Sequence, residues 1–229
     1  MVETVEPFKE ILSNYFNQKF SRTEGEVSFW DREVGVYHAS DFGKCLRKLY
    51  YEHKLGKRKR EKSYPDLHLG NKVEYIIKDA LANHYGYDFI KNSYRIELDL
   101  GDCKVVGQTD PVLVGVNGEV EKLFEIKSTK SLKYRKEEGP AENHLMQVHP
   151  YMKGLGLDFC TIVYVQKSDL EVLPYKVRFD KETFARGKTR ILILHKALTG
   201  GSPPEAEPFC PDWECRFCNY SEECPKGGD

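Results

Sequence analysis

Apolar and polar residues alternate over several short stretches of the chain, and this pattern predicts β-strands. In the stretch 123–128, Phe124 and Ile126 alternate with Glu125 and Lys127, as in a half-buried strand. Side chains alternate faces along a strand, so Glu125 and Lys127 are expected on one face and the apolar pair in the core. Further strands are predicted over 94–100, 104–107, 159–166 and 172–179.

Apolar residues at helical spacing predict five helices. The first has Val5, Phe8, Ile11, Leu12, Tyr15 and Phe16 on one side. The second starts with Ser40 as its cap, ends near Gly56 and buries Phe42, Leu46, Leu49 and Tyr50. The third spans 67–85 and is expected to bury Leu69, Val73, Ile76, Ile77, Ala80 and Leu81. The others span 141–155, where Pro150 is expected to kink or split the helix, and 180–198.

The order of these elements predicts an α/β fold with a mixed central β-sheet flanked by helices. The chain has 229 residues, 40% of them hydrophobic and 31% charged, which suits one globular domain. No apolar run is long enough to span a membrane, and the N-terminus lacks the apolar core of a signal peptide, so we expect a cytoplasmic protein without a membrane partner. Because the net charge is −1, any contact with nucleic acid must come from local basic patches.

The candidate chemistry is concentrated around Glu125. The strand 104–107 is expected to form a hairpin with the Glu125 strand through a turn at 116–119, which would bring Asp110 close to Glu125. Two converging carboxylates bind a hard divalent cation, and Lys127 beside them can orient or deprotonate a water molecule. This set of residues is suited to metal-assisted hydrolysis of a phosphodiester. The alternative is a surface Glu–Lys pair without catalytic function.

Two predicted helices carry further candidates. Glu74 lies at the border of the apolar face of its helix, where it either extends to water or points at a charged group near the sheet. His144, Gln147 and Tyr151 share one face of the 141–155 helix.

Two basic runs are candidates for holding DNA. The first covers 54–62, and the second consists of Lys130, Lys133, Arg135 and Lys136, directly after Lys127. A basic run is usually a solvated loop, but the same charges supply sequence-independent affinity for phosphates. Tyr134 or Tyr151 would be available to stack on bases.

Seven cysteines include three with short spacing at the C-terminus, namely Cys215, Cys218 and Cys224. In a cytosolic protein such a group indicates metal or cluster ligation. Zinc and iron–sulfur sites usually have four ligands, and the candidates for the fourth are Cys45, Cys210, Cys103 and Cys160. Cys103 and Cys160 lie in or beside predicted strands and are better explained as core residues. Cys45, at the start of a helix, would join the N-terminal region to the tail.

The motifs together resemble the RecB-like nucleases of the PD-(D/E)XK superfamily, and most closely the CRISPR-associated exonuclease family with an iron–sulfur cluster. They are, in order, a distant cysteine, Gly-x3-Glu, Gly-x2-Asp, Glu-x-Lys, Gln-x3-Tyr and Cys-x2-Cys-x5-Cys, and they cover about residues 40–224. The resemblance implies a restriction-endonuclease-like core. It also divides a single nuclease domain, 1–229, into an N-terminal helical region (1–66) with one cluster cysteine, a nuclease core (67–199) and a cysteine-rich tail (200–229).

The resemblance also assigns roles to residues. It implies that Asp110, Glu125, the Ile126 carbonyl and Glu74 hold Mg²⁺ or Mn²⁺, that Lys127 is catalytic, and that Gln147 and Tyr151 lie beside the active site. It implies a cluster, typically 4Fe–4S, on Cys45, Cys215, Cys218 and Cys224. Many family members have histidine at the position of Glu74, which leaves the metal preference open.

The implied function is a metal-dependent DNA exonuclease acting on single-stranded DNA or DNA ends. The implied setting is CRISPR spacer acquisition beside the integrase complex, or DNA repair and recombination. The alternative is a non-catalytic DNA-binding or assembly module with a structural zinc or iron–sulfur site. It explains the cysteines and basic runs equally well, but not the spacing of Asp110, Glu125 and Lys127.

Overall fold

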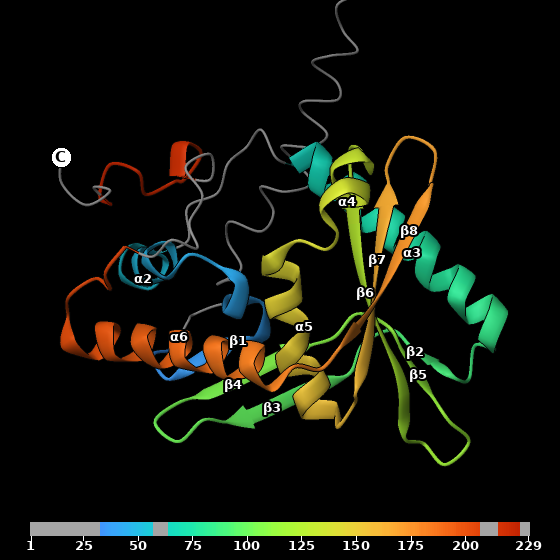
Figure 1. The fold of residues 1–229 in the computed structure, drawn as a ribbon, viewed down its shortest axis with the longest axis horizontal. Coiled ribbons are helices and arrows are strands. Elements are labelled where there is room, and N and C mark those ends of the chain that lie inside the picture. Colours follow the sequence, from blue (N-terminus) through green and yellow to red (C-terminus); the bar gives the residue numbers. More distant parts are fainter. Residues whose placement is uncertain (1–32, 57–63, 207–214, 225–229) are drawn as a thin grey trace, which may run out of the picture.

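The structure is a computed structural model that describes residues 33–56, 64–206 and 215–224. The first predicted helix and most of the basic run at 54–62 lie outside these residues. The described chain forms two β-sheets with helices between and around them (Figure 1).

The larger sheet has five strands in the order β2-β5-β6-β7-β8. Only β6 and β7 pair in parallel, so the sheet is mixed, and the predicted α/β class is confirmed. The strands are β2 (Ile90–Lys91), β5 (Val112–Val114), β6 (Val120–Thr129), β7 (Phe159–Gln166) and β8 (Val172–Arg178).

The smaller sheet has the order β1-β4-β3, with β1 at Val36–His38, β3 at Arg95–Asp99 and β4 at Lys104–Gln108. The predicted hairpin between the 104–107 strand and the Glu125 strand is therefore wrong. The expected turn is present, but the strand that precedes it is β5. The physical reason lies at Pro111, which has no N–H to donate, so the chain leaves β4 and starts a new strand beside β6.

Strand β6 lies in the middle of the larger sheet and is buried on both faces. Leu123, Phe124, Glu125 and Ile126 are all less than 8% exposed. Phe124 and Ile126 pack toward α3 (Tyr64–Tyr85), whereas Leu123 belongs to the main core on the opposite face. The prediction of a half-buried strand is thus wrong, because helices cover both sides of the sheet.

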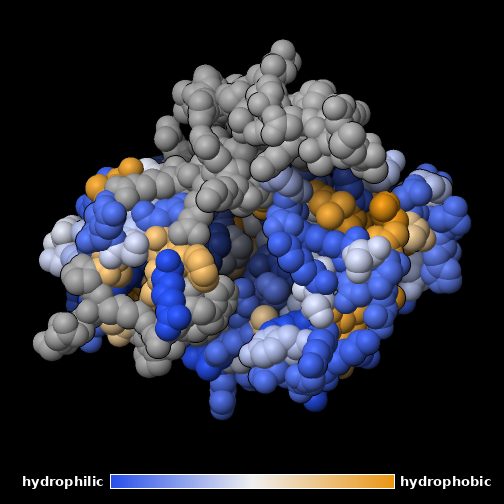
Figure 2. All heavy atoms as spheres, turned by 90° about the horizontal axis from the view of Figure 1, so that it is seen from above, coloured by the Kyte–Doolittle hydropathy of each residue, from blue (hydrophilic) through white to orange (hydrophobic). Residues whose placement is uncertain are grey.

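Helix α3 contacts the larger sheet through a narrow stripe of residues along one side of the helix. Val73 is 2% exposed and packs with Ile126 and Ile77, while Gly70 approaches Ser128 so closely that an added Cβ would lie 3.1 Å from its Oγ. The predicted burial of Leu69, Ile76 and Ala80 is wrong, since all three are exposed. Figure 2 shows apolar groups on the side of the molecule where α3 lies.

Helix α5 (Glu142–Leu155) lies between the two sheets and contacts both. It runs through Pro150 as one helix, so of the two predicted outcomes, a kink or a split, the split is wrong. It ends at Gly156, which adopts a left-handed conformation with φ 69°.

The predicted helix from Ser40 to Gly56 is two elements, the short 3-10 helix η1 (Ala39–Gly43) and α2 (Leu46–Leu55). Ser40 lies inside η1, and Asp41 accepts the His38 N–H at 2.9 Å. Cys45 is the N-cap of α2 with extended ψ, which separates the two elements. The four predicted apolar residues are buried as expected.

The remaining helices are α4 (Lys133–Glu138) and α6 (Lys181–Gly200). Asp180 caps α6 by accepting the N–H groups of Glu182 and Thr183, both at 3.1 Å. Helix α6 packs against α2 and η1, so the N-terminal elements are joined to the core. Among the residues that the structure describes, no helix is both long and apolar enough to cross a membrane.

The cysteine-containing tail at 215–224 lies against α2. The rings of Tyr51 and Tyr220 stack with centroids 6.2 Å apart, and the Tyr220 hydroxyl donates to the Gly56 carbonyl at 2.5 Å. Just before the tail, the Arg47 guanidinium donates to the Pro204 carbonyl at 2.8 Å. These contacts place the tail beside the helix that Cys45 caps.

Candidate active site

Asp110 and Glu125 meet at the centre of the larger sheet. Asp110 lies between β4 and β5, where the chain passes from one sheet to the other, and its Oδ2 accepts the Ile126 N–H at 2.7 Å. The neighbouring Phe124 N–H donates to the Pro111 carbonyl at 3.1 Å. The expected proximity of Asp110 to Glu125 is therefore present, although strand β4 does not provide it.

Glu125, Lys127 and Gln147 form a hydrogen-bonded triangle. The Lys127 ammonium lies 2.6 Å from Glu125 Oε1, to which the Gln147 amide also donates at 2.7 Å. The same ammonium donates to Gln147 Oε1 at 3.1 Å. The strand period puts Glu125 and Lys127 on one face, and α5 lies over that face, so Gln147 holds both side chains in one orientation.

The electrostatics of this group are unusual. Burial, followed by the charge of Glu125, raises the pKa of Asp110 to about 7. Burial alone would lower the pKa of Lys127, but the adjacent Glu125 carboxylate outweighs it, and the pKa is raised. Lys127 is therefore an ammonium at neutral pH, which can donate hydrogen bonds to a water molecule but cannot take its proton.

Glu125 has a buried oxygen, Oε2, with no hydrogen-bond partner among the described residues. Leaving a carboxylate oxygen buried and unpaired is costly, and a second carboxylate beside it increases the cost. Hard divalent cations prefer oxygen ligands of this kind. The residues present here thus fit a bound Mg²⁺ or Mn²⁺ ion.

Glu74, the further carboxylate predicted as a metal ligand, lies on α3. Its carboxylate pairs with Lys78 at 2.5 Å, and its side chain is 33% exposed, yet its charge contributes to the raised pKa of Asp110. In the described part of the chain, no three His, Cys, Asp or Glu side chains are arranged to hold a metal ion together. Glu74 is thus near the carboxylate pair without completing a ligand set.

Tyr151 lies beside the site as a buried residue, only 5% exposed. Its hydroxyl donates to the Gln108 carbonyl at 3.1 Å, and burial raises its pKa. An added Cβ on Gly107 would lie 2.6 Å from the Tyr151 ring, so only glycine fits there. The expectation that Tyr151 could stack on bases is wrong, because neither face of a buried ring is open. Tyr134 is 58% exposed, with the Arg135 guanidinium 4.5 Å from its ring.

Comparisons with known proteins agree with this geometry. No protein-family model matches the chain. The CRISPR-associated exonuclease Cas4 of Saccharolobus solfataricus is 22% identical over 197 residues, which cover 85% of this chain and 89% of the relative. The crystal structure of SSO0001 superposes with a TM-score of 0.66 at 20% identity, covering 96% of this chain and 98% of the other. An alkaline exonuclease from Laribacter hongkongensis gives a TM-score of 0.52 at 14% identity, covering 73% and 90%.

The chain has the fold of the RecB-like exonucleases. Its resemblance to the Cas4 exonucleases, inferred from the motifs, is confirmed by these similarities.

Within this RecB-like fold, a pocket of about 350 Å³ opens between α3 and the end of β6. Its walls combine charged and small polar side chains with the backbone of β6. They are formed by Asp66, Leu67, Gly70, Asn71, Glu74, Ile126, Lys127, Ser128 and Lys167. The pocket gives Lys127 and Ile126 a route to solvent. The pattern of hydrophobic residues did not predict it, because α3 and β7 reach this place only through tertiary packing.

A second pair of residues near the site also depends on tertiary structure. Tyr164 is paired with Lys127 in the β6–β7 register, and its hydroxyl accepts the Ala141 N–H at 3.0 Å. The same hydroxyl is hydrogen-bonded to His144 Nδ1 at 2.8 Å. Burial, with the nearby charges of Lys127 and Arg135, lowers the pKa of His144 to about 3, so the imidazole is neutral. The pair ties the start of α5 to β7.

The second basic run is only partly available to ligands. Lys130 pairs with Asp66 at 3.0 Å and Lys136 with Glu171 at 2.8 Å. Arg135 donates to the Gly139 carbonyl at 3.0 Å.

The predicted cluster ligands lie on two neighbouring segments. Cys215, Cys218 and Cys224 have free thiols and are partly exposed, whereas Cys45 is in a disulfide. Cys103 and Cys160 are buried core residues, as expected, and burial raises the pKa of each. Because a cluster ligand is a free thiolate, ligation by Cys45 would require its reduction.

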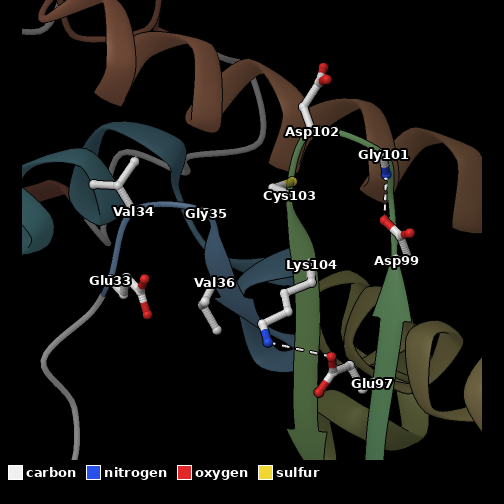
Figure 3. Close-up of a pocket in the computed structure, with 10 residues that line it drawn as sticks. All are labelled: Glu33, Val34, Gly35, Val36, Glu97, Asp99, Gly101, Asp102, Cys103 and Lys104. Carbon is white, nitrogen blue, oxygen red and sulfur yellow. Dashed lines mark hydrogen bonds and ion pairs between the residues drawn. The ribbon is translucent and has the colours of Figure 1, made fainter.

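A larger pocket, of about 420 Å³, lies beside β1 and the β3–β4 hairpin (Figure 3). Several carboxylates line it, but Glu97 pairs with Lys104 at 3.4 Å and Asp99 accepts the Gly101 N–H at 2.8 Å. None of the predicted catalytic residues lines this pocket.

Proposed function

We propose that the protein is a metal-dependent deoxyribonuclease that hydrolyses phosphodiester bonds in single-stranded DNA or at DNA ends. The observation that carries this proposal is the convergence of Asp110, Glu125 and Lys127, with one Glu125 oxygen buried and unpaired. If Glu125 and Lys127 formed only a structural ion pair, a second, partly neutralised carboxylate such as Asp110 would not be needed beside them.

The chain would bind the metal through Asp110, Glu125 and the Ile126 carbonyl, with Glu74 as a further ligand once released from Lys78. A Mg²⁺ or Mn²⁺ ion at this position would supply Lewis-acid stabilisation of the charge that develops on the scissile phosphate. Asp110 must lose its proton to act as a ligand, and because burial raises its pKa to about 7 in the metal-free chain, protons should compete with the metal increasingly as pH falls below 7.

Lys127 would orient the attacking water and donate to a phosphate oxygen. Its ammonium is held by Glu125 and Gln147, at 2.6 and 3.1 Å, so it enters the reaction already in place. Gln147 keeps Glu125 and Lys127 from separating when a substrate approaches, and Tyr151 supports the packing of α5 on β4.

The names of similar proteins support DNA as the substrate. The relative from Saccharolobus solfataricus is a CRISPR-associated exonuclease, and one solved structure of the Laribacter hongkongensis enzyme contains dAMP. By analogy we propose a role in processing DNA ends for CRISPR spacer acquisition, beside the integrase complex, with DNA repair as the related alternative.

We also propose an iron–sulfur cluster, of the 4Fe–4S type, on Cys45, Cys215, Cys218 and Cys224. The support is the contact of the tail with α2, together with three free thiols at the spacing of cluster ligands. Cluster assembly would require Cys45 in its reduced form.

A cleavage assay tests the nuclease proposal. Labelled single-stranded DNA should be cut by the purified protein with Mn²⁺, but not in EDTA, and Glu125→Gln should be inactive while keeping the parent's melting temperature. Glu74→Ala should lose activity and partly recover at high Mn²⁺ if Glu74 is a ligand. Equal cleavage by the parent and Glu125→Gln would overturn the assignment of the site. Binding of DNA without any cleavage would favour a non-catalytic binding module.

A further inference from the structure

Two lysines at the edge of the pocket beside Lys127 share one carboxylate. The Lys130 ammonium lies 3.0 Å from Asp66 Oδ2, and the Lys167 ammonium lies 3.8 Å from Asp66 Oδ1. Lys167 also donates to the Asp66 backbone carbonyl at 2.9 Å. Two positive charges thus face a single negative one, and Asp66 cannot neutralise both.

The two lysines differ in how they are held. The side chain of Lys167 is 14% exposed and lines the pocket, so its charge has a fixed position. Lys130 is 78% exposed, so packing constrains its side chain less. A backbone hydrogen bond of 2.9 Å from the Lys167 N–H to the Thr129 carbonyl fixes the ends of β6 and β7 side by side. The cation pair therefore lies where β6 leaves the catalytic residues.

The residues that line the pocket suit a phosphate group of a strand that extends from the active site. Ser128, with a hydroxyl, and Asn71, with an amide, line the pocket together with Lys127 and Lys167. The absence of a side chain at Gly70 leaves room for the Ser128 hydroxyl at the pocket wall, since an added Cβ would lie 3.1 Å from it. Donors of this kind, with a fixed ammonium, recognise a phosphate group.

We propose that Lys167 and Lys130 bind a backbone phosphate of the DNA strand next to the scissile bond, and that Asp66 holds both lysines until the strand displaces it. This inference rests on the proposed function, because it takes DNA as the ligand. Asp66 acts as an internal competitor for the subsite. Its removal should therefore strengthen DNA binding, the opposite of what the loss of a supporting residue would do.

Fluorescence anisotropy with a labelled single-stranded oligothymidylate, measured in EDTA to prevent cleavage, tests this. Asp66→Asn should lower Kd by about two- to fivefold, because an exposed ion pair of ordinary strength need no longer be broken. Lys167→Met keeps the buried aliphatic stem and should raise Kd by about fivefold at 0.1 M salt, while flattening the log–log salt slope by about 0.7.

Two control variants change the charge equally at the far end of α3. Asp88→Asn and Lys91→Met lie beyond the last turn of that helix and do not line the pocket. Effects of Asp66→Asn and Lys167→Met that clearly exceed those of their controls, in opposite directions, would support the subsite. Effects equal to the controls, in a parent that binds and cleaves DNA, would overturn the subsite alone. A parent that neither binds nor cleaves DNA would instead remove the proposed function.

Discussion

The carboxylate–lysine site and the cysteine tail are held in the structure by different means. Glu125, Lys127 and Gln147 are bonded to one another inside the fold, between β6 and α5. The contacts of the tail at 215–224 with α2 include the stacking of Tyr220 on Tyr51 and the hydrogen bond from the Tyr220 hydroxyl to the Gly56 carbonyl. The first region is thus preorganised by the core, whereas we expect the second to depend on a bound cluster for its order.

The largest expected effect tests the preorganised site. Lys127→Ala should reduce DNA cleavage by about 10²–10⁴-fold, because it removes the group that orients the attacking water. The melting temperature should fall, because the variant leaves the buried Glu125 carboxylate without its ion-pair partner, but the chain should stay folded with Asp110 and Glu125 in place to bind metal. Single-turnover cleavage with Mn²⁺ gives the rate, and circular dichroism checks the fold. A variant that cuts as fast as the parent, in preparations free of contaminating nuclease, would place the chemistry elsewhere.

The next effect tests the dependence of the tail on a cluster. The double variant Cys215→Ser/Cys218→Ser, purified without oxygen, should contain neither iron nor acid-labile sulfide. Because cluster binding contributes folding free energy, the melting temperature should fall, by about 2–4 °C for each kcal/mol of stability that is lost. Cys103→Ala, which removes a buried thiol outside the ligand set, is the control and should keep its iron. If the parent contains zinc and no sulfide, the cysteines form a zinc site and the cluster proposal is wrong.

A pH-dependent effect measures how much the buried Asp110 carboxylate of the preorganised site lowers the stability of the fold. The pKa of Asp110 is about 7 in the folded chain, above its ordinary value of 3.8, mainly because of burial. The folded chain therefore holds this proton more tightly than the unfolded chain, and the metal-free protein loses stability as pH rises from about 4 to 7. Asp110→Asn should raise the melting temperature in EDTA at pH 8 and not at pH 4. An equal shift at both pH values would contradict this origin.

The smallest effect tests whether Tyr151, on the same helix as Gln147, has a structural role or a catalytic one. Tyr151→Phe removes the hydrogen bond to the Gln108 carbonyl and should cost about 1 kcal/mol of unfolding free energy. Cleavage should stay within about twofold of the parent, because the Tyr151 hydroxyl is linked to Glu125 only through the Gln147 side chain among the described contacts. Urea denaturation and the cleavage assay measure the two quantities. A large loss of cleavage with unchanged stability would assign Tyr151 a direct catalytic role.

Much of the fold follows from local patterns. The strand predictions at 94–100, 159–166 and 172–179 match β3, β7 and β8 to within one or two residues, and the 180–198 helix matches α6. These elements succeed because alternation and helical spacing reflect burial of one face against a single core. Helix α3 was predicted with the correct C-terminal end, a start three residues too late and a partly wrong buried face, because its apolar residues exceed the narrow stripe that β6 contacts.

The sequence by itself determined which side chains share a face. The period of two along β6 puts Glu125 beside Lys127, and helical spacing in α5 puts Gln147 in line with Tyr151. The tertiary structure alone decided the rest. Asp110 accepts a hydrogen bond from the Ile126 N–H, and β4 belongs to another sheet. Lys167 and Asp66 meet at one pocket. Local periodicity records only the neighbours of a residue along its own element. Contacts between distant segments depend on how whole elements pack, and no short pattern encodes that.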